Sequence, residues 1–249
     1  MYKNAVNPPN IRHFFVLLQL KGVFMQIEPI AYFESPFTSK FGIPRQSGLA
    51  ETVGGRIVFV EPYRQAEALR GLESFDYVWI VWGFSANVAA PKHPTVRPPR
   101  LGGNERLGVW ATRSPFRPNN LGLSSVRIRR IVTEGAGAPS IEVMGADLMD
   151  GTPIYDVKPY LPYADSHPDA RGGFTDTHQW EPLHVVLPAD VARLLTADER
   201  AALSETLSLD PRPSYQSQPD RIYGMPFGRW DIRFRVAGRE LTVVEVVKK

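Results

Sequence analysis

Arginine is concentrated in one stretch of this 249-residue chain. Residues 92–130 hold nine lysines and arginines and a single acid, Glu105, a local balance of +8 in a chain whose formal net charge is +3. All but Lys92 are arginine, whose guanidinium suits planar partners such as carboxylate and phosphate. The stretch therefore predicts either an anion-binding surface or a solvated face whose charges pair with exposed acids.

The segment ATRSPFRPNN, residues 111–120, favours a binding surface. Arg113 and Arg117 lie on either side of Pro115, and a second proline, Pro118, follows. Prolines stiffen a loop, and stiff loops hold polar side chains in the fixed positions that binding requires. Charge patterning alone is equally consistent with an arginine-rich rim that forms salt bridges in solvent.

Two other motifs carry polar side chains that can share a pocket with these arginines. FGIPRQSG, residues 41–48, places Arg45 and Gln46 directly after a proline. The motif DLMDGTPIYDVKPY, residues 147–160, contains Asp147, Asp150, Asp156 and Lys158. Acids at a strand end bind hydroxyl groups, although an aspartate before glycine more commonly caps a turn. Because loops from successive strands converge at the end of a barrel, we expect these motifs to meet in one pocket.

Several kinds of chemistry are excluded or disfavoured by the sequence. The chain has no cysteine, which excludes disulfides, thiolate zinc sites and thiol nucleophiles and fits a reducing compartment. Neither a Rossmann glycine motif nor a P-loop is present, and LGGNERLG, residues 101–108, is only a glycine-rich loop. His178 and His184 are too far apart for a helical metal-binding pair, so no metal site is predicted.

Alternating hydrophobicity predicts a mainly β protein. Strands are expected at GRIVFVEP (55–62), FDYVWIVWGF (75–84), SVRIRRI (125–131) and WDIRFRV (230–236). A helix is expected within 63–72, with Gly71 as its stop, and two more at 188–195 and 196–207, the last opened by a capping box from Thr196 to Glu199. Many short strands with little helix indicate a small antiparallel β-barrel domain with a smaller α+β C-terminal lobe.

Four segments are expected along the chain. Residues 1–24 are a loose N-terminal extension, because their apolar run at 14–24 is too short to span a membrane and no cleavage site follows it. A strand is expected at 25–33, and Met25 is a candidate biological start. The barrel is predicted over 25–162, a linker or long loop over 163–183, and the C-terminal lobe over 184–249.

Five ordered motifs resemble those of the TrmO family, also called TsaA-like or YaeB-like proteins. They are FGIPRQ (41–46), GLESFDYVW (71–79), VRPPRLGGNERLGVWATRSPFRPNNLGLS (96–124), DLMDGTPIYDVKPYLPYAD (147–165) and DPRPSY (210–215). The resemblance implies a β-barrel methyltransferase that uses S-adenosylmethionine. It implies methylation of the exocyclic nitrogen of threonylcarbamoyladenosine, beside the anticodon of threonine tRNAs. It also implies a homodimer. The lack of cysteine favours the cytoplasm, and the short apolar run at 14–24 predicts no membrane association.

The resemblance gives the arginine-rich stretch two roles, in the cofactor pocket and on the tRNA-binding face. The implied cofactor-binding residues are Arg45, Gln46, Ser47, Ser85, Ala86, Arg113, Leu123, Gly145, Ala146 and Asp147. Candidates for contact with the tRNA are Arg97, Arg100, Arg106, Arg117, Arg127 and Arg129. Asp147 or Asp150 is the candidate base, with water or a tyrosine such as Tyr155 as the alternative.

The chain departs from the usual family pattern at three places. Asp76 and Tyr77 replace a Ser-His pair, Ser85 replaces a histidine, and Asn120 replaces a proline. Any histidine contact at the first two places is lost. Two alternative functions therefore stay open, a non-catalytic RNA-binding barrel and an S-adenosylmethionine-dependent methyltransferase for another substrate.

Overall fold

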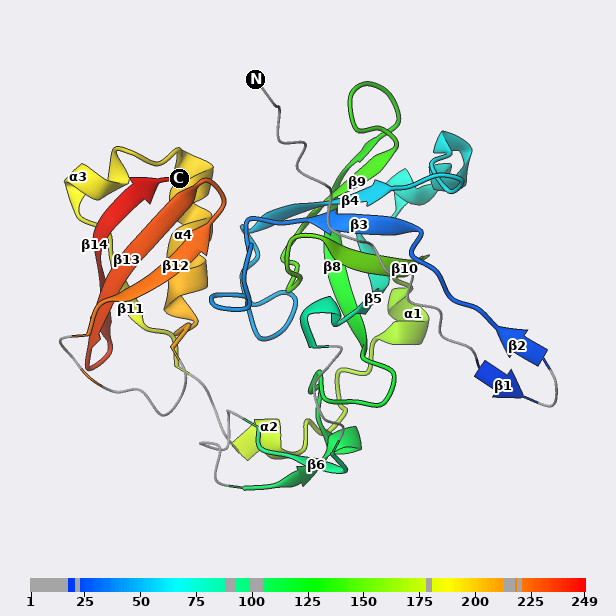
Figure 1. Ribbon diagram of the computed structural model, residues 1–249, viewed down its shortest axis with the longest axis horizontal. Coiled ribbons are helices and arrows are strands. Elements are labelled where there is room, and N and C mark those ends of the chain that lie inside the picture. The colour runs from blue at the N-terminus through cyan, green and yellow to red at the C-terminus, as the bar shows by residue number, and fades with distance from the viewer. Residues whose placement is uncertain are drawn as a thin grey trace, which may run out of the picture.

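The structure is a computed structural model that describes residues 18–20, 23–87, 93–98, 105–177, 181–212, 218 and 221–249. A six-stranded barrel and a smaller sheet carrying two helices lie side by side (Figure 1). The predicted fold class, a mainly β barrel with an α+β C-terminal lobe, is confirmed.

The barrel closes in the strand order β10-β3-β4-β9-β8-β5, and every neighbouring pair is antiparallel. Its strands are β3 (Ala31–Glu34), β4 (Gly54–Phe59), β5 (Tyr77–Gly83), β8 (Leu121–Val132), β9 (Ser140–Met144) and β10 (Thr152–Pro159). On β5, Val78, Ile80 and Trp82 are buried while Tyr77, Trp79 and Val81 are more exposed. Two-residue periodicity therefore fills the barrel interior with aliphatic and aromatic side chains.

The C-terminal lobe is a four-stranded sheet in the order β11-β14-β13-β12. Its elements are β11 (His184–Val186), α3 (Ala189–Ala192), α4 (Ala197–Ser208), β12 (Tyr223–Phe227), β13 (Trp230–Ala237) and β14 (Glu240–Lys248). The predicted capping box is present, since the Thr196 side chain accepts from the Glu199 backbone N–H and the Glu199 carboxylate accepts from the Thr196 N–H.

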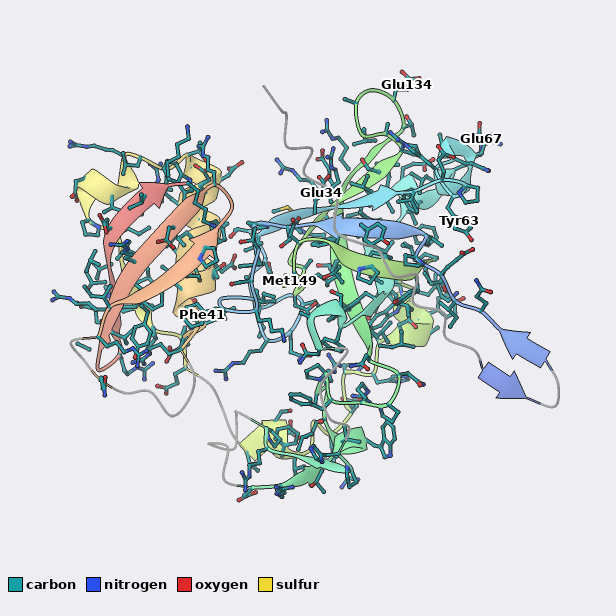
Figure 2. All side chains as sticks on the ribbon, in the orientation of Figure 1. Glu34, Phe41, Tyr63, Glu67, Glu134 and Met149 are labelled. Atoms are coloured by element: carbon teal, nitrogen blue, oxygen red, sulfur yellow. The ribbon has the colours of Figure 1, made fainter. Side chains whose placement is uncertain are left out.

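The segment between β3 and β4, residues 35–53, joins the two bodies. Its residues Phe37, Ala50 and Val53 are buried in the hydrophobic core of the C-terminal lobe. Phe41 stacks against Phe234 of β13, with ring centroids 6.4 Å apart, and is labelled between the barrel and the C-terminal sheet in Figure 2. The C-terminal lobe therefore holds a loop that belongs to the barrel domain.

Two predicted elements differ from the structure. The helix expected at 63–72 is instead a pair of 3₁₀ turns, η1 (Ala66–Leu69) and η2 (Leu72–Ser74), because Gly71 between them has a left-handed backbone with φ of 88°. The strand expected at 25–33 is divided between β2 (Val23–Met25), which pairs with β1 (Leu18–Leu20), and β3, which begins at Ala31. Pro29 lies in the interruption, where a missing backbone N–H prevents regular pairing.

The remaining elements are short. They are η3 (Ser85–Asn87), β6 (Thr95–Val96), β7 (Leu107–Gly108), η5 (Val109–Ala111), α1 (Pro162–Asp165) and α2 (Phe174–Thr177). Both α1 and α2 lie at or within the predicted linker. Of the helices in the described ranges, none combines the length and apolarity needed to cross a membrane.

Candidate active site

A cavity of about 820 Å³ opens beside β5 and β8 of the barrel. Ligand pockets in proteins are usually roughly 300 to 1,000 Å³, so it has the size of a cofactor site. Its wall is built from five segments, within residues 40–46, 79–87, 110–117, 121–123 and 147–152. The first of these belongs to the loop that the C-terminal lobe holds, and Met149 of the last is labelled in Figure 2.

The structure brings together most of the residues expected to bind the cofactor. The cavity wall includes Arg45, Gln46, Ser85, Ala86, Arg113, Leu123 and Asp147. Ser47, Gly145 and Ala146 do not line it. Gly145 and Ala146 are buried behind it, and the Gly145 carbonyl accepts a hydrogen bond of 2.8 Å from the Gly48 N–H. This bond attaches the loop of Arg45 and Gln46 to the segment that carries Asp147.

Asp147 is a half-buried carboxylate on the cavity wall. Its Oδ1 accepts a hydrogen bond of 2.6 Å from the Ser124 hydroxyl. Burial raises the pKa of the Asp147 carboxyl above its ordinary value, while the bond from Ser124 and the charge of Arg113 act in the opposite direction. A carboxylate in this position can accept from a ligand hydroxyl or amine, and protonation of Asp147 removes the negative charge that attracts a cationic ligand group.

The structure does not bring Asp150, the other candidate base, into the cavity. Its Oδ1 accepts a hydrogen bond of 3.0 Å from the Ser35 N–H, and it lines a different hollow together with Glu34 and Arg56. Tyr155 also lies outside the cavity wall, and burial raises the pKa of its phenol. The contact to Ser35 is a long-range one that ties the turn at Asp150 to the end of β3.

Arg113 and Arg117 are fixed differently on the loop between η5 and β8. Arg113 Nη1 donates to Gln46 Oε1 at 2.6 Å, which links this loop to the one held by the C-terminal lobe. Arg117 Nη1 donates to the Thr112 carbonyl at 2.8 Å, and its guanidinium lies 5.6 Å from the ring centroid of Trp110. Both arginines line the cavity, and each retains donor groups for a ligand because a guanidinium has five N–H groups.

Asn120, which replaces a family proline, has a left-handed backbone with φ of 50°. Its side-chain amide donates to the Pro115 carbonyl at 3.0 Å, and its own carbonyl accepts from the Phe84 N–H at 2.8 Å. Asparagine tolerates this conformation, whereas proline is fixed near a φ of about −65°. The asparagine therefore permits a loop geometry that proline excludes.

The other departures lie on and beside β5. Ser85 opens η3 and lines the cavity. The backbone carbonyl of Asp76 accepts a hydrogen bond of 2.7 Å from the Ile128 N–H. Tyr77 is 43% exposed and contacts the ring of Tyr160, with centroids 6.2 Å apart. Both replacements of the Ser-His pair thus lie outside the cavity wall.

Of the arginines proposed to contact tRNA, Arg117 alone is on the described cavity wall. Arg97, Arg127 and Arg129 are exposed, Arg106 donates to the Thr95 hydroxyl at 3.0 Å, and Arg100 lies outside the described residues. The register between β8 and β9 shifts between Ile128 and Arg130. Simple alternation therefore does not continue through Arg129, because the extra residue of a bulge interrupts it.

Sequence reasoning did not single out four residues that shape this site. Lys40, Trp82 and Trp110 line the cavity, and Ser124 holds Asp147 from behind. In the sequence, Trp82 and Ser124 look like ordinary strand residues. Trp110 differs from them because its side chain is 71% exposed at the cavity. An aromatic residue directly before the ATR motif was the one signal that pointed to Trp110.

Two family models together cover most of the chain. The tRNA-methyltransferase O N-terminal domain matches residues 32–166, and the TrmO C-terminal domain matches residues 181–249. The chain belongs to the TrmO family. The TrmO N-terminal model thus covers the barrel with its cavity, and the C-terminal model covers the lobe that holds the loop of residues 35–53.

Individual proteins and a solved structure of this family are also similar to the chain over most of its length. An Escherichia coli K12 protein named tRNA (adenine(37)-N6)-methyltransferase is 40% identical over 230 residues, 88% of this chain and 97% of its own. An Eikenella corrodens protein of the same name is 43% identical over 70% of this chain and 97% of its own. A crystal structure of TrmO from Pseudomonas aeruginosa superposes with a TM-score of 0.72 at 32% identity, covering 95% of this chain and all of that one.

Proposed function

We propose that this TrmO family member is an S-adenosylmethionine-dependent methyltransferase acting on the exocyclic nitrogen of adenosine 37 in tRNA, as its relatives' names indicate. The observation that carries the proposal is a cofactor-sized cavity whose wall sets the Asp147 carboxylate among arginines. The proposed substrate is the threonylcarbamoyl form of that adenosine in threonine tRNAs.

The cavity wall fits the chemical groups of S-adenosylmethionine. Asp147 can accept from the ribose hydroxyls or the amine of the cofactor, and the guanidinium of Arg113 matches its carboxylate. The indole of Trp82 and the ring of Phe84 are in contact on the same wall, with centroids 4.3 Å apart. Phe84, supported from behind by the buried Trp82, provides an aromatic surface of the kind that packs against adenine.

When bound, S-adenosylmethionine supplies an electrophilic methyl group on its sulfonium. The protein's tasks are to align the acceptor nitrogen with that methyl group and to let one proton leave, since direct displacement needs no covalent intermediate. Alignment on rigid groups is worth roughly 7 to 11 kcal/mol of barrier in favourable cases. The loops of Arg113 and Gln46, linked by their 2.6 Å hydrogen bond, provide such rigidity. Asp147 is the candidate proton acceptor, because Asp150 lies outside the cavity.

Trp110 supports the assignment of a nucleobase substrate. Val109 of η5 is buried and anchors the turn, while the neighbouring Trp110 ring is 71% exposed at the cavity. Exposed aromatic rings beside arginine are typical platforms for an unstacked base, and stacking is worth about 1 to 3 kcal/mol per base. We infer that the substrate adenine stacks on Trp110 while Arg117 meets its threonylcarbamoyl carboxylate.

Replacing Trp110 by alanine is expected to raise the KM for tRNA by about tenfold, because one stacking interaction is lost. Affinity for S-adenosylmethionine should stay within about twofold of the parent. Trp110→Phe, which keeps a flat ring, should recover most of the loss. Steady-state methyl transfer with varied tRNA checks this, and an unchanged KM in a folded Trp110→Ala variant would remove Trp110 from the substrate site.

The exposed arginines of β8 are proposed to lie against the tRNA backbone. Neutralising Arg127 and Arg129 together should weaken tRNA binding and reduce the slope of log affinity against log salt, by about 0.9 for each phosphate that is no longer neutralised. Arg130→Gln is the matched control, because Arg130 is already paired with Glu142 at 2.6 Å. If binding measured across a salt series keeps its slope in the double variant, these two arginines belong to a solvated face.

We further infer that the protein works in the cytoplasm as a homodimer. Support comes from the family resemblance, from a substrate that is a tRNA, and from a sequence without cysteine, which suits a reducing compartment. Light scattering of the purified protein at several concentrations tests the oligomeric state.

Calorimetric titration with S-adenosylmethionine separates the proposal from a non-catalytic RNA-binding barrel. A methyltransferase should give saturable heat at one site per chain, whereas a barrel that only binds RNA should give none. Assays of methyl transfer to purified nucleosides and tRNAs then separate the proposed function from a methyltransferase for another substrate.

A further inference from the structure

The Asp147 carboxylate is held by a chain of two buried side chains on neighbouring strands. Ser124 of β8 is 2% exposed and donates to Asp147 Oδ1 at 2.6 Å. Trp82 of β5 is 6% exposed and donates from Nε1 to the Ser124 Oγ at 3.0 Å. The three groups therefore form one continuous hydrogen-bonded series that ends at the cavity.

The direction of this series follows from the groups that compose it. An indole N–H can only donate, so it occupies an acceptor site on the Ser124 oxygen. The hydroxyl has a single proton, which is directed to Asp147. A carboxylate that receives a donor in this way is favoured in its ionised form. Trp82 thus determines which way the Ser124 proton points.

Gly122 allows the indole to take this position. It is the cross-strand partner of Trp82 in the pairing of β5 with β8. A Cβ atom at this position would overlap the indole ring of Trp82. Because glycine has no side chain, the Trp82 ring approaches the β8 backbone closely enough to reach Ser124, two residues along the same strand.

The charged groups on the cavity wall make the ionisation state of Asp147 important for ligand binding. Asp147 is the single acid on the described cavity wall, where it is accompanied by Lys40 and Arg45 of the first loop and by Arg113 and Arg117 of the second. Burial raises the pKa of Asp147, and the Ser124 hydrogen bond, backbone N–H groups and Arg113 oppose that increase. Loss of the Ser124 donor therefore moves protonation of Asp147 to higher pH.

We propose that Ser124 and Trp82 are positioning residues that keep the Asp147 carboxylate oriented and ionised for a cationic or hydroxyl group of the cofactor. The inference rests on the proposed function only for the identity of the ligand. Its consequence is that ligand affinity falls as pH decreases through the Asp147 pKa, and that the fall begins at higher pH when the Ser124 hydroxyl is absent.

The first test needs no ligand. The pKa of Asp147 is measured by NMR titration of protein carrying isotope-labelled aspartate, with Asp147→Asn used to identify its signal. Ser124→Ala should raise this pKa, and Trp82→Phe, which keeps a ring but loses the N–H, should raise it less. Ser125→Ala is the matched control, since Ser125 is the next residue of β8, faces away from the barrel interior and is outside the cavity wall. It should leave the pKa unchanged. An unchanged Asp147 pKa in folded Ser124→Ala would overturn the proposal.

The second test follows S-adenosylmethionine affinity by calorimetry across the pH range in which the variants stay folded. Ser124→Ala should lower affinity by about tenfold at the acidic end, as expected for a lost hydrogen bond to a charged group, and the loss should shrink as pH rises. In the Asp147→Asn background the same substitution should produce no pH-dependent loss. A loss of equal size at every pH would mean that Ser124 only supports the fold. Absence of binding by the parent protein would instead refute the proposed function, while the NMR titration would still decide the roles of Ser124 and Trp82.

Discussion

Arg113→Ala is expected to weaken S-adenosylmethionine binding by about tenfold or more while the protein stays folded. A hydrogen bond to a charged group contributes about 1.5 to 3 kcal/mol, and the exposure of Arg113 places the expected effect toward the lower value. The substitution also removes the bond from Arg113 to Gln46, so two cavity loops lose their link. Calorimetry of the purified variant measures the change directly.

Two further variants identify the cause of the Arg113 effect. Arg113→Lys keeps the positive charge but loses the forked geometry, so it should remain clearly weaker than the parent. Arg106→Ala is the matched control, because Arg106 belongs to the same basic stretch, bonds to Thr95 and lies outside the cavity wall. Unchanged affinity in folded Arg113→Ala would place Arg113 outside the cofactor site.

Methyl transfer to threonine tRNA is expected to depend strongly on the threonylcarbamoyl group. The group adds a carboxylate that Arg117 at the cavity can bind in a bidentate manner. Its ureido linkage also makes the reacting N–H more acidic than that of plain adenine. A site built to bind a polar group discriminates strongly against substrates that lack it, so kcat/KM should differ by at least about a hundredfold. The comparison uses one tRNA sequence, modified and as an unmodified transcript.

Arg117 provides the control for this discrimination. Arg117→Ala should lower kcat/KM for the modified tRNA while leaving the already low value for the transcript nearly unchanged. The ratio between the two substrates should therefore decrease. Equal incorporation into both tRNAs by the parent protein would contradict recognition of the threonylcarbamoyl group and favour a methyltransferase for another substrate.

The barrel could be predicted from the sequence because a half-buried strand repeats every two residues. Val78, Ile80 and Trp82 follow that repeat, and each is buried in the structure. The stop at Gly71 was expected and is present, but helical spacing alone does not distinguish an α-helix from the 3₁₀ turns that form on either side of it. The packing of the 35–53 loop on the C-terminal lobe could not be predicted either. Nothing in the sequence around Phe37 shows that it packs in the core of that lobe.

The candidate site could be predicted in part for a similar reason. Arg113 and Asp147 belong to distinctive motifs, so their convergence on one pocket was expected. Ser124 and Trp82 lie 42 positions apart in the sequence and Ser124 lies 23 positions from Asp147, and no local pattern indicates hydrogen bonds over such separations. The sequence around Asp150 allows a site residue or a turn cap, and the structure places Asp150 outside the cavity with a long-range bond to the Ser35 N–H that no local pattern indicates.

The most direct test of the account is nucleoside mass spectrometry of one reaction. Purified protein, S-adenosylmethionine and threonine tRNA carrying threonylcarbamoyladenosine are incubated together, and the tRNA is digested to nucleosides. The account predicts that threonylcarbamoyladenosine is converted to a form with one added methyl group on its exocyclic nitrogen, and that Asp147→Asn greatly reduces the conversion. Recovery of threonylcarbamoyladenosine unchanged, with protein that is folded and saturated with S-adenosylmethionine, would contradict it.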